Sequence, residues 1–266
     1  FFQLFYTITN LMKHTFQIQS TLSKSEWLCS YTVTLSNDKK NVRQIDVLKL
    51  AGNEPPKMLS NIIEEVFRSS LIPSSRVIKD FDVMKDQKNQ IIFLKEYHQG
   101  KSLRDMIEKA KQQKKPLPLY FIFSVFYELC LTLYETHRFL LPDGNTVEIV
   151  HGGVKPENII ITPTGKIRMT QFGVSRNALY HSLAVNPYSN LYLSPEQIEM
   201  GFQNFPNYQI IDHFSDIFQL GLVLYEMMTL RLPFQGRNPQ EQLQMIQSGQ
   251  FIKPSVYFPE FPQLID

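Results

Sequence analysis

The stretch Ile149-Val-His-Gly-Gly-Val-Lys-Pro-Glu-Asn-Ile-Ile-Ile161, followed by Met169-Thr-Gln-Phe-Gly173, decides the fold that we predict for this chain. Two short apolar and β-branched segments within and beside it, Ile159–Ile161 and Ile167–Met169, predict a pair of strands. The segment Thr162-Pro-Thr-Gly165 between them supplies the Pro and Gly of a tight turn. Because such a hairpin holds its two flanking loops side by side, we expect their side chains to converge on one ligand.

Composition favours a globular protein over a nucleic-acid-binding or membrane protein. The 266 residues are 43% hydrophobic and carry a formal net charge of +2, which suits one globular unit or two lobes around a cleft. The lysine pairs Lys39-Lys40 and Lys114-Lys115 are too short for a nucleic-acid footprint. The two cysteines, Cys29 and Cys130, form no motif, which fits a reducing compartment and a cytoplasmic location.

The two ends of the chain predict a fragment of a longer protein, because the sequence begins at Phe1 and stops abruptly at Asp266. The first residues, 1–12, are apolar but too short and too often interrupted by polar residues to span a bilayer. They also lack the basic start of a signal peptide. We therefore expect no membrane segment, and we assign residues 1–14 to an N-terminal extension.

The central stretch resembles the catalytic loop and the metal-binding loop of eukaryotic protein kinases, whose signatures are H-R-D-L-x-x-x-N and D-F-G. The corresponding segments here are His151-Gly-Gly-Val-Lys-Pro-Glu-Asn158 and Gln171-Phe-Gly173. Gly153 stands at the position of the catalytic aspartate, and Gln171 stands at the position of the magnesium-binding aspartate. This chain therefore keeps several signature residues of both loops, such as His151, Asn158 and Phe172, but has neither of the two aspartates.

Two later segments continue the resemblance in the order that the family has. Ser194-Pro-Glu196 is similar to the A-P-E signature. The segment Ser215–Leu230 is apolar on nearly all sides, which predicts a fully buried helix. In the family, the aspartate of this helix, here Asp216, holds the backbone of the catalytic loop.

The resemblance covers residues 15–266 and implies an α+β, bilobal, protein-kinase-like fold. A small lobe with an antiparallel five-stranded sheet and one helix would occupy residues 15–97. A mainly helical large lobe, incomplete at its C-terminus, would occupy residues 98–266.

Alternation of apolar and polar residues predicts the small-lobe strands, which are residues 16–18, 31–35, 45–50, 77–83 and 91–94. A turn is expected at Ser36–Asn41 and a helix at Pro55–Leu71. Where the family has a glycine-rich phosphate loop, this chain has Ser23, Ser25 and Leu28. Glycine lets the backbone approach a phosphate closely, so its absence favours an ordinary hairpin turn over a phosphate cradle.

In the large lobe, start and stop signals predict individual helices. Ser102 is expected to cap a helix that ends before a polar loop at Lys111–Lys115. A long amphipathic helix is expected at Leu119–His137, followed by an inserted loop or hairpin at Arg138–Glu148 with a turn at residues 142–144. A last helix is expected between Asn238 and Gly249.

The resemblance implies nucleotide-binding positions, which are Lys49, Glu65, Glu96, Lys155 and Asn158. Lys49 would pair with Glu65 (Glu64 is the less favoured partner), and Asn158 would be a weak metal ligand beside Gln171. Lys95 stands at the back of the expected pocket, where a buried charge needs a partner such as Glu65.

The replaced acids predict a pseudokinase, which is a kinase fold without phosphoryl transfer. Gly153 offers no general base, a loss that alone costs roughly 10²–10⁴-fold in rate. Gln171 is neutral and a poor Mg²⁺ ligand. Glycine at position 152 also replaces the arginine that reads activation-loop phosphates in many kinases, so we expect no switching through that residue. We expect a regulatory or scaffolding module with weak or no ATP binding, and a protein partner such as an active kinase.

Two alternatives stay open at this stage. The first is an atypical, slow, ATP-dependent Ser/Thr protein kinase that takes its missing acid from Glu157 or Glu26. The second is a generic interaction domain that uses the fold as a scaffold and binds no nucleotide.

Overall fold

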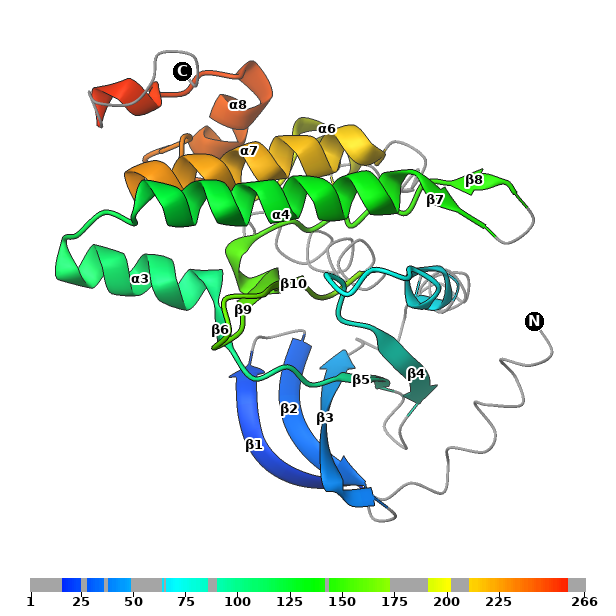
Figure 1. The fold of residues 1–266 in the computed structure, drawn as a ribbon. Helices are drawn as coiled ribbons and strands as arrows, with labels where there is room; N and C mark the ends of the chain where they lie inside the picture. The colour runs from blue at the N-terminus through cyan, green and yellow to red at the C-terminus, as the bar shows by residue number, and fades with distance from the viewer. Residues whose placement is uncertain are drawn as a thin grey trace. The chain divides into compact units, whose positions relative to one another are not determined.

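The computed structural model describes residues 16–24, 28–35, 38–48, 64, 66–85, 90–141, 144–172, 191–201 and 211–257 (Figure 1). The chain divides into two compact units, one of residues 1–73 and 78–99 and one of residues 74–77 and 100–266. The N-terminal extension, Lys49 and Glu65 lie outside the described residues.

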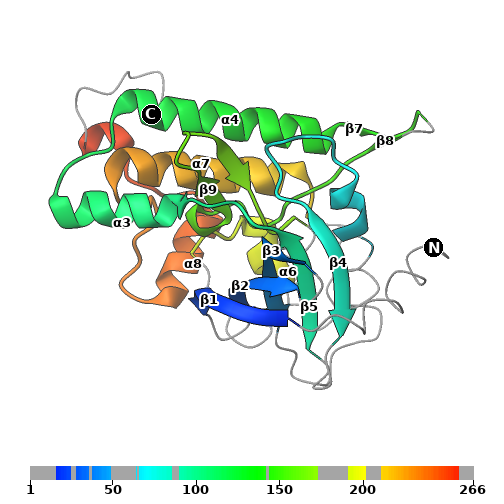
Figure 2. The same cartoon turned by 60° about the horizontal axis from the view of Figure 1, so that its bottom comes forward.

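The first unit is a five-stranded antiparallel sheet, as predicted, so the fold is α+β. The spatial order of its strands is β1 (Phe16–Lys24), β2 (Leu28–Leu35), β3 (Asp38–Leu48), β5 (Ile91–Glu96) and β4 (Asp80–Lys85). Figure 2 shows β4 and β5 side by side at the end of this order. Strands β1 and β2 form the predicted hairpin, with Ser23 paired with Ser30 and Lys24 with Cys29.

Side-chain alternation gives the sheet two different faces. One face carries an apolar cluster built on Val33, Ile45 and Leu94. The register places Asp46 of β3 opposite Phe93 of β5, and both side chains are buried on the other face. The carboxylate of Asp46 therefore lies in the interior of this unit.

Several predicted strand boundaries and one turn are wrong: β1 continues to Lys24, β2 begins at Leu28, β5 ends at Glu96, and β3 and β4 begin at other residues than predicted. Strand β3 begins at Asp38, and its pairing with Leu35 extends the strand through most of the turn that we expected at Ser36–Asn41. Pairing with β2 thus outweighs the turn-like composition of this segment. Strand β4 begins at Asp80 rather than Val77, because Val77 forms a bridge with Met169 in the second unit. Of the helix predicted at residues 55–71, the structure describes Glu64 and residues 66–71; Glu64 and residues 66–70 are helical, and Leu71 already lies in a turn.

Five helices form the framework of the described part of the second unit. They are α3 (Leu103–Gln113), α4 (Leu119–His137), α6 (Pro195–Gly201), α7 (His213–Thr229) and α8 (Pro239–Ser248), with short 3-10 turns η2 (Pro156–Asn158) and η4 (Pro254–Val256). Helix α4 lies along α7, as Figure 1 shows, and their apolar side chains form the core. Most of α7 is buried, but Ile217 on this helix is exposed, so the prediction of a helix that is buried on all sides is wrong for that part of its surface.

Short strands complete the second unit. Strands β9 (Ile159–Ile161) and β10 (Ile167–Met169) form the predicted hairpin, and β6 (Lys101–Ser102) pairs with β9. Gly165 closes the turn with a φ of 78°, and its N–H donates to Thr162 O. A second hairpin, β7 (Phe139–Leu140) and β8 (Thr146–Val147), stands where the sequence predicts a loop or hairpin.

The predicted helix caps are confirmed. Ser102 forms a reciprocal capping box with Asp105, and Asn238 accepts from the N–H of Glu241. Gly249 ends α8 with a φ of 67°. Helix α3 continues to Gln113, however, so the polar loop expected from Lys111 begins later than predicted.

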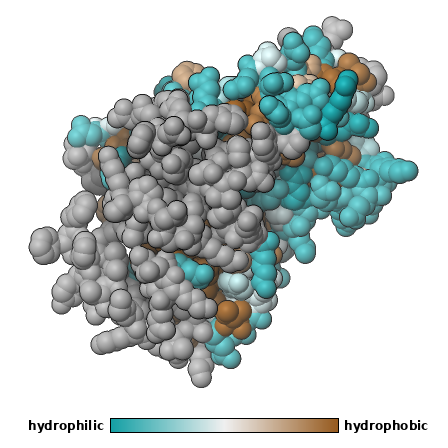
Figure 3. Space-filling view, turned by 180° about the vertical axis from the view of Figure 1, so that it is seen from behind, coloured by the Kyte–Doolittle hydropathy of each residue, from teal (hydrophilic) through white to brown (hydrophobic). Residues whose placement is uncertain are grey.

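Among the helices that the structure describes, α4 is long and apolar enough to cross a membrane, by length and composition only. A core helix meets the same criterion, and α4 contributes buried residues such as Val125 and Leu129 to the core. On the face shown in Figure 3, the coloured residues are mainly hydrophilic, and hydrophobic ones form small separate patches.

Candidate functional site

The candidate site is the loop His151–Asn158 together with Thr170–Phe172, which flank the β9–β10 hairpin. The hairpin brings these two segments together, as predicted: Thr170 N–H donates to Asn158 O at 3.0 Å. The rings of His151 and Phe172 meet edge to face, with centroids 4.5 Å apart, and both side chains are fully buried. The site therefore begins as a packed and hydrogen-bonded pair of loops.

Asp216 of α7 fixes the backbone of the first loop, which confirms the expectation from the resemblance. Its carboxylate accepts from the N–H groups of His151 and Gly152, at 2.8 and 2.7 Å. His137 Nε2 of α4 lies 2.7 Å from the same carboxylate. Asp216 is fully buried, so these contacts replace the hydration that an isolated buried carboxylate would lose.

Two glutamines add a second anchor that the sequence analysis did not find. Gln219 of α7 accepts from Val154 N–H at 2.7 Å, and Gln197 of α6 donates to Gly152 O at 2.9 Å. The two glutamine side chains are joined by a hydrogen bond of 2.8 Å. Their amides can donate and accept at once, which suits them to joining two helices to one loop.

His151 is held as a neutral imidazole. Its Nδ1 accepts from the N–H of Gly153 at 3.1 Å, and its Nε2 donates to Thr170 O at 2.9 Å. Burial lowers the pKa of His151 below its ordinary value, and the charge of Lys155 lowers it further, while Asp216 opposes both. An uncharged ring with both nitrogens engaged links the two loops structurally.

The residues present do not fit the Mg²⁺ site that the resemblance implies. Asn158 Nδ2 donates to Gly153 O at 2.8 Å, so this amide supports the loop. Gln171 is buried and has a φ of 73°, a left-handed conformation that costs a non-glycine residue about 1–2 kcal/mol. No three His, Cys, Asp or Glu side chains gather as metal ligands within the described ranges. Because Mg²⁺ prefers carboxylate oxygens, this donor set is unsuited to it.

Glu157, the acid proposed for a slow kinase, is engaged by an arginine. Arg104 of α3 binds Glu157 through Nε at 2.8 Å and Glu226 through Nη1 at 2.7 Å. Arg104 also donates to Tyr192 Oη at 2.6 Å, and Lys111 binds Glu226 at 3.0 Å. Burial raises the pKa of Glu226, but these donors hold it below its ordinary value. Sequence reasoning missed this network, since its members are far apart in the chain.

Lys155 is half-buried and lines an open cavity of about 630 Å³ in the second unit. Arg104, Glu157 and Glu226 line the same cavity. Lys155 therefore lies beside carboxylates that are already paired with Arg104 and Lys111.

In the first unit, Lys95 is fully buried in a triad with two aspartates. Its Nζ lies 2.6 Å from Asp46 and 3.2 Å from Asp80. Glu65, the partner that we expected for Lys95, lies outside the described residues, so that expectation is still a prediction; the neighbouring Glu64 pairs with Arg68. Pairing of β3 and β4 with β5 brings the two aspartates to Lys95. Alternation along β3 could have indicated Asp46, but not Asp80.

The pKa values of the two aspartates in the triad are shifted in opposite directions. Burial raises the pKa of Asp80 to about 6 although Lys95 opposes this, whereas Lys95 outweighs the effect of burial at Asp46 and lowers its pKa. Burial lowers the pKa of Lys95, but the two carboxylates raise it above its ordinary value. The lysine is thus held charged in the interior of the sheet.

Of the remaining predicted nucleotide-binding positions, Lys49 and Glu65 lie outside the described residues. Glu96 is half-buried, and its carboxylate lies 3.1 Å from His98 Nε2. Each of these positions is therefore still a prediction.

Comparison with known proteins agrees with this fold. A family model described as the protein kinase domain matches residues 31–262, so the chain belongs to the protein kinase family. It is 27% identical to the human serine/threonine-protein kinase Nek2 over 211 residues, covering 77% of this chain and 44% of that protein. It is 29% identical to the serine/threonine-protein kinase drp72 of Corynebacterium efficiens over 224 residues, covering 79% of this chain and 39% of that protein. The chain thus spans less than half the length of these two relatives.

Proposed function

We propose that this protein kinase domain is a pseudokinase, which regulates or scaffolds a protein partner and does not transfer phosphate. The carrying observation is Gly153, which has no side chain where the family has its catalytic base. The loop around it is held by Asp216, Gln197 and Gln219 through contacts that require no side chain at position 153. The fold is thereby kept without the group that would act on a substrate hydroxyl.

The contacts of the nearby carboxylates support this proposal. A general base must be free to accept a proton within hydrogen-bond reach of the substrate. Asp216 is occupied by two loop amides and His137, and Glu157 is occupied by Arg104. The slow-kinase alternative therefore requires Glu157 to break its ion pair with Arg104. Otherwise Glu26, which lies outside the described residues, would have to act as the base.

The proposal includes weak ATP binding that does not depend on Mg²⁺, because Gln171 supplies no carboxylate for the metal. It also includes a protein partner, such as an active kinase, and a cytoplasmic location. The location is supported by the two cysteines, Cys29 and Cys130, which form no disulfide.

A thermal-shift titration with ATP tests this part of the proposal. We expect millimolar ATP to raise the melting temperature by no more than about 1–2 °C, and by the same amount with and without Mg²⁺. The Lys49→Ala variant is the control for binding through the expected nucleotide lysine. A large rise that requires Mg²⁺ and is lost in Lys49→Ala would support the slow-kinase alternative instead.

A further inference from the structure

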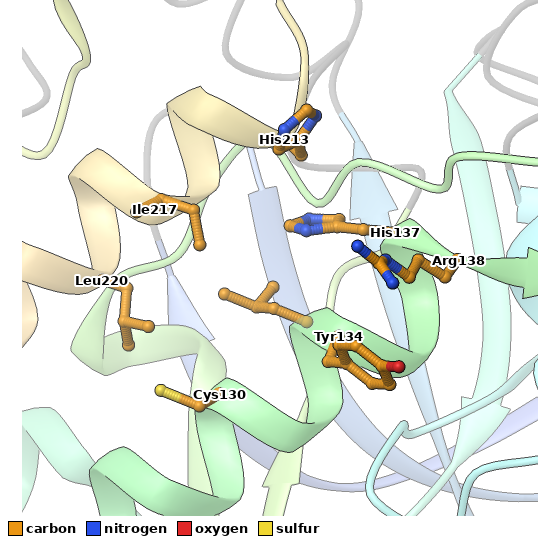
Figure 4. Close-up of a pocket in the computed structure, with 8 residues that line it drawn as sticks. Cys130, Tyr134, His137, Arg138, His213, Ile217 and Leu220 are labelled. Atoms are coloured by element: carbon orange, nitrogen blue, oxygen red, sulfur yellow. The ribbon is translucent and has the colours of Figure 1, made fainter.

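A separate cavity of about 390 Å³ lies in the second unit, between the C-terminal half of α4 and the N-terminal half of α7 (Figure 4). Cys130 and Tyr134 of α4 and Ile217 and Leu220 of α7 face the same space in this view. Its walls are mainly apolar side chains. Since a water-sized group occupies about 30 Å³, the cavity has room for roughly a dozen non-hydrogen atoms.

Basic side chains stand at one end of this apolar cavity. His137 and His213 line it with ring centroids 5.7 Å apart, and each contacts a carboxylate, Asp216 for His137 and Glu148 for His213. Those two carboxylates offset the charge that either imidazole can carry. The cavity is therefore apolar at one end and polar at the other.

Arg138 supplies the cation at the polar end. Its guanidinium lies over the Tyr134 ring, 5.2 Å from the centroid, and points towards the space beside His137 in Figure 4. Among the ion pairs of the described residues, none involves Arg138. A planar guanidinium that stacks on an aromatic ring keeps its edge available for a carboxylate.

We propose that this cavity binds an amphipathic carboxylic acid of the size of a medium-chain fatty acid. The chain would lie between Leu133, Ile217 and Leu220, and the carboxylate would meet Arg138. The cavity volume matches one such chain and is at the lower end of the range for small-molecule sites. The proposal is independent of whether the domain transfers phosphate, because the site lies outside the loop that carries Gly153.

Cys130 provides a reporter of occupancy. It lines the cavity and is partly exposed, whereas Cys29 is buried at 3% exposure. We would measure the rate at which a maleimide labels Cys130 at constant pH, with decanoate, decanol or decyltrimethylammonium added below the concentration at which each forms micelles. We expect decanoate to slow labelling saturably. Decanol should bind roughly two- to fivefold more weakly, the range that one exposed ion pair supplies, and the cation should bind more weakly still.

Two variants test the two ends of the cavity. Arg138→Gln should abolish the preference for decanoate over decanol. Ile217→Trp should fill the cavity and abolish protection by both. Phe214→Trp is the matched control, because Phe214 is on the same helix, is exposed and does not line the cavity.

Three outcomes would overturn the proposal. Equal protection by decanoate and decanol in the parent would remove the role of Arg138. Protection that survives Ile217→Trp would place the ligand elsewhere. A Cys130 that fails to react in the absence of any ligand would mean that the cavity is covered by protein rather than open to a small molecule.

Discussion

At the scale of a single residue, His151, which stands at the histidine of the catalytic-loop signature, has a structural role. Its two ring nitrogens engage Gly153 N–H and Thr170 O, so the neutral Nε2–H tautomer satisfies both contacts. Protonation would place a second donor opposite the N–H of Gly153. The histidine thus joins the two loops in one charge state only.

We expect His151 to titrate below its ordinary pKa of 6.5, chiefly because it is buried. The unfolded chain then binds more protons than the folded chain below about pH 6.5, so this residue makes stability fall as the pH falls through that value. Ring ¹⁵N shifts measured against pH would report its midpoint and tautomer. A midpoint above 6.5, or a proton on Nδ1, would contradict the assignment.

For Asp80 we predict the opposite dependence of the folding stability on pH. Its folded pKa of about 6 exceeds its ordinary value of 3.8, so the folded chain binds more protons between these values. Stability from this residue is therefore lost as the pH rises from about 4 to 6. Asparagine cannot titrate, so Asp80→Asn should match the parent near pH 4 and exceed it near pH 7 by roughly 2–3 kcal/mol.

Urea unfolding of Asp80→Asn and the parent at several pH values measures this difference directly. The account requires the gap in free energy of unfolding to widen towards neutral pH. A constant gap would mean that Lys95 balances the effect of burial on Asp80, and a gap that widens towards acid would mean that Lys95 outweighs it; either result contradicts the account.

At the scale of an element, α7 acts as the support of the candidate site. Asp216 on its first turns receives two loop amides and His137, so Asp216→Asn replaces one acceptor oxygen by a donor. We expect a loss of about 1.5–3 kcal/mol in the free energy of unfolding, the range for hydrogen bonds to charged groups.

Asp212→Asn is the matched control for this prediction, because Asp212 caps the same helix by accepting from Phe214 N–H. Asparagine caps as well as aspartate does, so this variant should unfold within about 0.5 kcal/mol of the parent. Chemical unfolding of both variants provides the comparison. Equal losses would show that Asp216 is not a special anchor of the loop.

Most elements of the fold could be predicted from local signals. The β9–β10 hairpin follows from β-branched strands around a Pro-Gly turn, and the caps at Ser102 and Asn238 follow from their side-chain chemistry. The starts of β3 and β4 could not be predicted, because pairing with neighbouring strands decides them. Strand boundaries depend on tertiary contacts that no local pattern contains.

The arrangement of the site's backbone loops could be predicted from the sequence, but the ion-pair partners of its charged side chains could not. The resemblance placed Asp216 at the loop backbone, and the structure confirms this. The partners of Lys95 and of Glu157 were not predicted, because Asp46, Asp80 and Arg104 reach them only through strand pairing and helix packing. Charged side chains are mostly exposed in proteins, so a charged residue in a sequence is normally interpreted as a surface residue. The sequence alone therefore does not reveal which charged residues pair in the interior.

At the scale of the whole molecule, the domain keeps the framework of a kinase and lacks its acids. The five-stranded sheet, the buried helix α7 and the hairpin-linked loops belong to the protein kinase family. Gly153 and Gln171 stand where the catalytic and metal-binding aspartates of that family stand. Under the proposed pseudokinase function the protein would act through what it binds, and its charged cavity and its mainly apolar cavity offer surfaces for that role.

The most direct test of the central claim is transfer of labelled phosphate from ATP, measured on the purified protein itself and on a generic protein substrate. The account predicts no Mg²⁺-dependent incorporation above that of the Lys49→Ala variant, because Gly153 and Gln171 remove the base and the metal carboxylate. Incorporation that requires Mg²⁺ and disappears in Lys49→Ala would contradict the account and establish an atypical kinase.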